Sequence, residues 1–289
     1  MHMPSSKSEK IIKVKLSAIK DSPIDQKESV DLVATEEPLE IRIGYGEENN
    51  RIQKSISVTM CTPGNDLDLA TGFLFTEGIL KTKDDILSCR YFGDLNSPDN
   101  RNNIVMVELQ PGVKFDAKKL DRHFYTSSSC GVCGKTSIDS VRNIMEKVTG
   151  NDGIKISPSI IITLPELLRK RQEIFQHTGG LHASALFDLN GQLLHTREDV
   201  GRHNALDKLV GLSLTAGELP LDHHILLLSG RASFELVQKA VMAGIKFICA
   251  VGAPSSMAVE MAREFGITLV GFLRENRFNI YSGEERVAG

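Results

Sequence analysis

The second half of the chain alternates short apolar runs with helical patterns, and no other feature limits the possible folds as much. The run Ile225-Leu226-Leu227-Leu228 is the clearest, because a continuous apolar stretch of this length suits a strand buried on both faces. Strands are expected at 224–228, 246–251, 268–273 and 278–281. Helices are expected at 202–214, 233–243 and 256–265. The alternation predicts an α/β domain over residues 126–289, with parallel strands in a three-layer arrangement.

The same domain begins with elements of other kinds. Helical patterns cover 137–148 and 164–176, and Asn190-Gly191 between the apolar stretches 183–189 and 192–197 is typical of a two-residue hairpin turn. Before it, residues 29–125 predict a smaller α+β domain. Its strands are expected at 30–35, 38–43, 51–60, 86–92 and 103–109, with a helix at 66–77. Residues 1–28 show no sustained period, which predicts a disordered or frayed lead.

Composition narrows the class of protein. The 289 residues are 41% hydrophobic, which is enough to fill a sizeable core. A net charge of -3 does not favour a general nucleic-acid or membrane-surface binder. The chain contains no apolar run of membrane-spanning length and no signal-peptide pattern at its start. Its five cysteines are an odd number and do not indicate a disulfide framework, so we expect a soluble, cytoplasmic protein.

Two cysteines stand three residues apart in the loop Ser127-Ser128-Ser129-Cys130-Gly131-Val132-Cys133-Gly134-Lys135. Lys135 and the start of the following helical pattern both favour the thiolate and so a reactive sulfur. Three interpretations stay open from the spacing alone: sulfur chemistry, a metal site, and an uninvolved surface pair. A structural zinc site usually needs a second pair of ligands, which the histidines His177, His182 and His203 could supply.

Polar residues follow each of the expected parallel strands. The segments are Ser229-Gly230-Arg231-Ala232-Ser233, Gly252-Ala253-Pro254-Ser255-Ser256 and Phe272-Leu273-Arg274-Glu275-Asn276-Arg277. Ligands of such sheets bind beyond the carboxyl ends of the strands. Hydroxyls, helix N-termini and arginines together suit a phosphate-bearing, nucleotide-like ligand. Each segment alone could equally be a tight turn and a helix cap.

The segment Glu198-Asp199-Val200-Gly201-Arg202-His203-Asn204 is dense in polar groups at the start of a helix, which is typical of a site. The alternative is that Asp199 is only an N-cap residue. Two enzyme classes are disfavoured. A zinc nucleobase deaminase needs a His-x-Glu, whereas the chain has His182-Ala183-Ser184, and no Gly-x-Ser-x-Gly indicates a serine hydrolase.

Several of these segments together resemble one known family. Cys130-Gly131-Val132-Cys133-Gly134, Thr178-Gly179-Gly180-Leu181-His182, the block from Glu198 to Lys208, and Ser229 to Glu235 look like signature motifs of the formate dehydrogenase accessory sulfurtransferases, the FdhD proteins. Thr71-Gly72-Phe73-Leu74 with Glu77-Gly78 is similar as well. The likeness runs in order from about residue 30 to the end.

This resemblance implies a sulfurtransferase that acts as a maturation factor, with a cytidine-deaminase-like fold in its larger domain. It implies that Cys130, with Cys133 as its partner, accepts persulfide sulfur from a cysteine desulfurase. The acceptor would be the molybdenum cofactor, a bis(molybdopterin guanine dinucleotide), before that cofactor enters formate dehydrogenase. A guanine nucleotide would be a partial mimic of the cofactor. The sequence leaves open whether the protein is a homodimer.

The implied cofactor-binding residues comprise the strip near the C-terminus and the other signature motifs. They are Phe272, Leu273, Arg274, Glu275, Asn276, Arg277, Ser229, Arg231, Gly179, Gly180, His182, Arg202 and His203. No metal is expected at the cysteines, because a sulfur carrier needs its thiolate free. The alternative from another class is a zinc-stabilised chaperone that binds the cofactor without sulfur chemistry.

Overall fold

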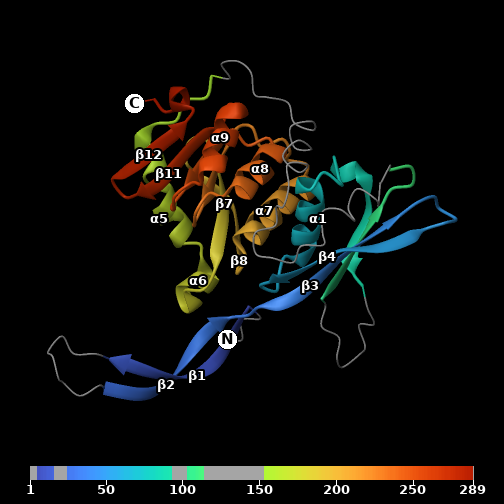
Figure 1. Ribbon diagram of the computed structural model, residues 1–289, viewed down its shortest axis with the longest axis horizontal. Coiled ribbons are helices and arrows are strands. Elements are labelled where there is room, and N and C mark those ends of the chain that lie inside the picture. The colour runs from blue at the N-terminus through green and yellow to red at the C-terminus, as the bar shows by residue number, and fades with distance from the viewer. Residues whose placement is uncertain (1–4, 16–24, 93–102, 114–152, 289) are drawn as a thin grey trace.

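The computed structural model describes residues 5–15, 25–92, 103–113 and 153–288, which form three sheets, and helices cover the largest of them (Figure 1). The largest sheet has the strand order β12 (Arg277–Ser282), β11 (Thr268–Arg274), β10 (Phe247–Ala250), β9 (His224–Leu228), β7 (His182–Asp188) and β8 (Leu193–Asp199). The predicted parallel strands are confirmed for β9, β10 and β11. The β7–β8 hairpin and β12 add antiparallel strands, so the sheet is mixed.

Helices cover both faces of this sheet, as predicted. One face packs against α7 (Arg202–Ala216), α8 (Phe234–Met242) and α9 (Ser256–Glu264). The other face packs against α4 (Pro158–Ile161) and α5 (Leu164–Arg169). Strand β9 shows why both faces need cover: Leu226 and Leu228 enter the first core, and Ile225 and Leu227 enter the second. Successive side chains of a strand point to opposite faces, so an all-apolar strand requires three layers.

The single helix predicted over 164–176 is wrong. The chain instead forms α5 and a separate α6 (Glu173–Thr178), and Gln172 between them has a ψ of 72°, outside the helical range. The first N–H groups of α6 have no acceptor within the helix. Those of Ile174 and Phe175 donate instead to the carboxylate of Glu198. Helix propensity depends on the local sequence and therefore does not predict a break that a tertiary contact stabilises.

A second sheet belongs to the first part of the chain. Its strand order is β4 (Ile52–Cys61), β3 (Glu37–Tyr45), β6 (Ile104–Leu109) and β5 (Ile86–Tyr91). The predicted hairpin of β3 and β4 is confirmed, and helix α1 (Asp66–Thr76) packs on the sheet through the predicted residues Ala70 and Leu74. Short 3-10 helices lie at Lys83–Asp85 and Glu284–Arg286. The core of this sheet is continuous with the first core of the large sheet.

Helices α1 and α7 join the two parts through backbone contact. A Cβ on Gly72 would lie 1.8 Å from the Asp207 carbonyl oxygen, and one on Gly211 would lie 1.9 Å from that of Asp68. Beside this contact, buried Lys239 of α8 forms ion pairs with Asp207 (3.0 Å) and Glu77 (3.2 Å). Lys239 therefore supplies a cation to two carboxylates inside the junction.

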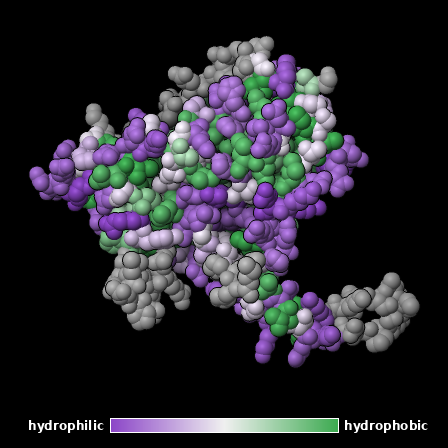
Figure 2. Space-filling model, turned by 180° about the vertical axis from the view of Figure 1, so that it is seen from behind, coloured by the Kyte–Doolittle hydropathy of each residue, from purple (hydrophilic) through white to green (hydrophobic). Residues whose placement is uncertain are grey.

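The frayed lead predicted over 1–28 is wrong for its described residues. Strands β1 (Ser6–Lys15) and β2 (Asp25–Ala34) form an antiparallel ribbon that projects from the body (Figure 1). The ribbon forms because residues far apart in the sequence pair with each other, such as Lys10 with Val30. The pattern of residues within a short stretch of sequence does not reveal such pairing. Figure 2 shows hydrophobic side chains among hydrophilic ones on this ribbon; Ile12 and Val30 are 64% and 62% exposed.

The C-terminal residues close back onto the start of the last described range. Ile156 forms a parallel β-bridge with Val287. The Ile156 N–H donates to the Arg286 carbonyl (2.8 Å), and the Ile156 carbonyl accepts the Ala288 N–H (3.1 Å). Across the described ranges, none of the helices has the length and hydropathy needed to cross a bilayer. The cysteine loop and the helix predicted over 137–148 lie outside the described residues.

Candidate functional site

Three loops meet beyond the carboxyl ends of β9, β10 and β11, and we call residues 229–233, 252–255 and 272–277 the rim. Backbone hydrogen bonds join them: the Gly252 N–H donates to the Gly230 carbonyl (2.8 Å), and the Phe272 N–H donates to the Gly252 carbonyl (3.0 Å). A Cβ at position 252 would lie 2.8 Å from the backbone of Arg231, so the loops can approach this closely only with glycine there. The prediction that the three polar segments share one edge is confirmed.

The strip 272–277 forms the turn of the β11–β12 hairpin. Phe272 has a left-handed φ of 51° and its ring is 42% exposed, while Glu275 and Asn276 are exposed at the turn. Leu273 is only 1% exposed and packs in the second core. This corrects the prediction for Leu273, whose side chain serves the core because the strand directs it inward.

The arginines of the rim are close together and incompletely paired. Arg274 donates to the Val251 carbonyl (2.6 Å), which fixes the hairpin to the end of β10. Arg277 lies directly opposite Arg274 in the β-ladder. Like charges in this position destabilise a hairpin unless an anion lies between them. Within the described ranges, the side chains of Arg231 and Arg277 form no hydrogen bond or ion pair, and only the backbone of Arg277 is paired in the ladder. Both guanidinium groups can therefore bind an anionic ligand.

Two histidines lie beside the same loops. The first, His182, begins β7, and its ring lies so near Gly230 that a Cβ there would be 3.2 Å from Nδ1. Burial lowers the pKa of His182, and the charges of Arg202 and Arg231 lower it further. Burial also lowers the pKa of His203 to about 4, helped by Lys239 and Arg202. Both rings are therefore neutral at pH 7, and His203 Nε2 lies 3.2 Å from Ser233 Oγ.

The remaining predicted residues fall into two groups. Ser229 continues the β7–β9 pairing, since its hydroxyl accepts the Ala183 N–H (2.8 Å) and its own N–H donates to the Ala183 carbonyl (2.9 Å). Gly179 ends α6 with a φ of 65°, and Gly180 follows it beside Ala34 of the ribbon. These two glycines form the turn that leads to His182. Ser229 and the two glycines thus shape the rim through the backbone.

Arg202 occupies the first turn of α7, near enough to His182 to lower its pKa. Its Nε is buried and has no hydrogen-bond partner in the part of the chain that the structure describes. An unpaired buried donor is costly, so this group favours a ligand that accepts a hydrogen bond. The structure thus brings together His182, Arg202, His203 and Arg231 on the side of the rim that α7 covers.

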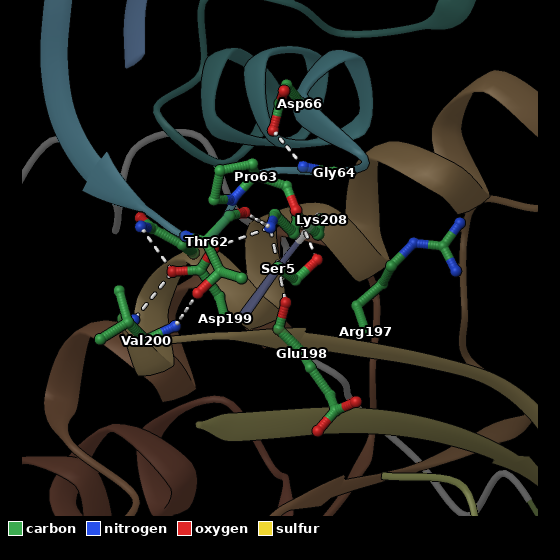
Figure 3. Close-up of polar contacts among 12 residues, drawn as sticks. Ser5, Thr62, Pro63, Gly64, Asp66, Arg197, Glu198, Asp199, Val200 and Lys208 are labelled. Atoms are coloured by element: carbon green, nitrogen blue, oxygen red, sulfur yellow. Dashed lines mark hydrogen bonds and ion pairs between the residues drawn. The ribbon is translucent and has the colours of Figure 1, made fainter. Parts of the chain in front are cut away.

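The sequence analysis expected a site at residues 198–204, with an N-cap role for Asp199 as the alternative, and did not predict the buried charge cluster that lies behind this turn. Asp199 is fully buried and forms an ion pair with Lys208 (2.7 Å), which is 1% exposed. The carboxylate also accepts the backbone N–H of Thr62 (3.0 Å) and of Gly201 (2.8 Å) (Figure 3). The sequence signal was an acid and a lysine nine residues apart around a helix start, and that spacing does not by itself indicate burial.

Cys130 and Cys133 lie outside the described residues. Burial raises the pKa of the described thiols Cys61 and Cys89 to about 12, and that of Cys249 even more, which makes all three poor nucleophiles. Within the described ranges, no three histidine, cysteine or acidic side chains gather as a metal site. Reactive sulfur in this chain is therefore expected only from the pair at 130 and 133.

Comparisons with known proteins agree on one family. A family model described as the FdhD/NarQ family matches residues 34–288, a range that includes both cysteines. The sulfur carrier protein FdhD of Streptomyces coelicolor is 46% identical over 281 residues, covering 96% of this chain and 94% of the relative. The protein of the same name from Sulfurisphaera tokodaii is 43% identical over 257 residues, covering 89% of this chain and 92% of the relative.

A solved structure supports the fold. It comes from Desulfotalea psychrophila and is provisionally named a formate dehydrogenase accessory protein. It matches with a TM-score of 0.71 at 22% identity and covers 99% of this chain and 100% of the other. At this identity the match bears on the fold alone, and it extends over both sheets.

Proposed function

Since this chain belongs to the FdhD/NarQ family, we propose that it is a sulfur carrier serving the maturation of a formate dehydrogenase. Relatives more than 40% identical over about nine-tenths of the chain are named sulfur carrier proteins. The observation that carries the cofactor part of the proposal is the rim, where arginines from two loops converge without enough acidic partners. A cytoplasmic location and a cytidine-deaminase-like layout of the large sheet belong to the same proposal.

The sulfur step is proposed for Cys130. Its thiolate attacks the terminal sulfur of a persulfide on a cysteine desulfurase, the donor's S–S bond breaks, and the donor cysteine leaves as a thiolate. One sulfur atom moves without net oxidation. Attack of the Cys133 thiolate on Cys130 Sγ then releases hydrosulfide to the acceptor and leaves a Cys130–Cys133 disulfide. A cellular dithiol reduces this disulfide and resets the pair.

The acceptor proposed is the bis(molybdopterin guanine dinucleotide) form of the molybdenum cofactor, bound at the rim as substrate. Arg231, Arg274 and Arg277 would pair with its phosphates, because guanidinium groups bind phosphate oxygens in a bidentate manner. The neutral imidazoles of His182 and His203 would add hydrogen bonds without adding charge. The exposed ring of Phe272 offers an apolar surface next to the arginines.

Guanosine diphosphate, a fragment of this cofactor, tests the rim. We expect isothermal titration calorimetry to show binding to the wild-type protein. The double variant Arg274→Ala/Arg277→Ala should bind at least about tenfold more weakly, since each charge-assisted hydrogen bond contributes roughly 1.5–3 kcal/mol. The matched control is Arg263→Ala, which removes an exposed arginine near the C-terminus of α9. Equal affinity in wild type and double variant would place the site elsewhere.

The sulfur step has its own test. Incubation with a cysteine desulfurase and cysteine should add the mass of one sulfur atom to the peptide that contains Cys130, and Cys130→Ala should abolish both this adduct and formate dehydrogenase maturation. Stoichiometric zinc on the purified protein without any sulfur adduct would instead support the zinc-stabilised chaperone. Sedimentation analysis would show whether the working state is a homodimer.

A further inference from the structure

We infer that Asp199 is a positioning residue for the rim, holding the first turn of α7 so that Arg202 and His203 face the ligand. The inference rests on the proposed function, since it concerns how the same rim is built. Asp199 itself is 0% exposed, so its carboxylate is enclosed by the protein. It acts through the residues it binds, which we call the Asp199 cluster: Thr62, Gly201, Asn204 and Lys208.

One carboxylate oxygen of Asp199 organises the start of the helix. Its Oδ1 accepts the Gly201 N–H (2.8 Å) and the side-chain amide of Asn204 (3.0 Å). The N-cap position of α7 is Gly201, which has no side chain to satisfy the free N–H groups there. Asp199 and Asn204 therefore fix the turn on either side of Arg202 and His203.

The other oxygen connects this turn to the first part of the chain. Oδ2 accepts the Thr62 N–H (3.0 Å) and pairs with Lys208 Nζ (2.7 Å). Lys208 in turn donates to the Thr62 carbonyl (2.7 Å), and the Val200 N–H donates to the Thr62 hydroxyl (3.1 Å). The N–H, the hydroxyl and the carbonyl of Thr62 are all hydrogen-bonded, and these bonds connect the end of β4 to the start of α7 (Figure 3).

The cluster also lies next to the ligand-facing groups. Asp199 is paired across the β7–β8 ladder with His182, and its charge raises the pKa of His182 against the effect of Arg202 and Arg231. A displaced carboxylate would therefore change both the position of Arg202 and the electrostatics at His182. A purely structural ion pair elsewhere in the helix would change neither.

Helix α7 provides that comparison in Asp207. This residue is also buried and also paired with a lysine, Lys239, but it faces α1 and α8. We expect Asp199→Asn to weaken guanosine diphosphate binding roughly tenfold, as is typical when a residue that orients a binding group is lost. Asp207→Asn should lower the melting temperature without changing the affinity, measured where both variants are folded by circular dichroism.

A spectroscopic readout separates positioning from stability. In Asp199→Asn the pKa of His182, followed by NMR, should fall below its wild-type value, because the carboxylate charge that raises it is gone. In Asp207→Asn it should stay at the wild-type value. An Asp199→Asn protein with wild-type affinity and a wild-type His182 titration would overturn the inference.

A milder variant covers the case in which Asp199→Asn does not fold. Asn204→Ala keeps the Asp199–Lys208 pair and removes the amide that donates to Asp199 and to the Met60 carbonyl (2.9 Å). We expect guanosine diphosphate to bind it about threefold more weakly, because the loss of these two hydrogen bonds weakens the attachment of the turn that carries Arg202 and His203. Unchanged affinity in this variant would then refute the inference. Absence of binding to the wild-type protein would instead refute the proposed rim, so the two failures are distinguishable.

Discussion

The α1–α7–α8 junction and the rim use the same kinds of charged side chain in opposite ways. At the junction, Lys239 has Asp207, Glu77 and the Thr76 hydroxyl as partners. At the rim, Arg231 and Arg277 have no partner in the described part of the chain, and Arg277 stands opposite another arginine. The difference teaches that charges inside the junction have partners within the fold, whereas the rim keeps arginines without one, as the proposed anion site requires.

The largest loss of stability is expected when a charge is left unpaired at the junction. Lys239→Met leaves the buried carboxylate of Asp207 without its cation, which typically costs about 3–5 kcal/mol. Urea unfolding should show this loss. The control Lys170→Met removes an exposed lysine paired with Glu166 and should leave stability nearly unchanged, because exposed ion pairs contribute little. If both variants lose the same amount, the junction pair has no special role.

Crowding the junction should have the next largest effect. In Gly72→Ala the new methyl group would lie 1.8 Å from the Asp207 carbonyl, so α1 and α7 must separate at a cost of about 2 kcal/mol or more. The same change at Gly180 would place the methyl group 3.5 Å from the Ala34 Cβ and 3.9 Å from the Thr178 carbonyl oxygen, which are ordinary contacts, and should be tolerated. Thermal melts of the two variants test this. A stable Gly72→Ala protein would contradict the close helix contact.

The smallest expected effect is on the pH dependence of stability, and it tests whether His203 beside the rim is neutral. His203 is neutral in the fold, with a pKa of about 4, whereas in the unfolded chain it takes up a proton near pH 6.5. Protonation of His203 in the unfolded chain therefore lowers the free energy of unfolding as the pH falls from about 6.5 to about 4. Between pH 7 and pH 5, His203→Gln should lose about 2 kcal/mol less than wild type in urea unfolding. Parallel curves would show that His203 is not buried as neutral imidazole.

Much of the fold follows from local patterns. The run at 225–228 predicts a strand covered on both faces, and Asn190-Gly191 predicts the β7–β8 hairpin; the structure confirms both. The failures involve contacts between distant segments. The β1–β2 ribbon depends on pairing between strands separated along the chain, and the break after α5 depends on Glu198. Periodicity within one window carries no information about either.

The candidate site was predictable where the residue type itself carries the chemistry. Strand ends with arginines and small residues identify the rim, and the structure brings Arg231 next to Gly252 and the strip at 272–277. Burial was not predictable at the same positions. Leu273 belongs to the core, and Asp199 lies at a helix start that could equally have been exposed. Only the contact between the end of β4 and α7 shows that Asp199 is a buried residue and not an exposed N-cap.

The bridge between Ile156 and Val287 has a consequence for changes to either segment. Arg286 and Ala288 each hydrogen-bond to Ile156, close to where the described chain resumes after the cysteine pair. Removing residues 286–288 would deprive Ile156 of both of these backbone hydrogen bonds. A change at either segment would therefore also alter the backbone pairing of the other.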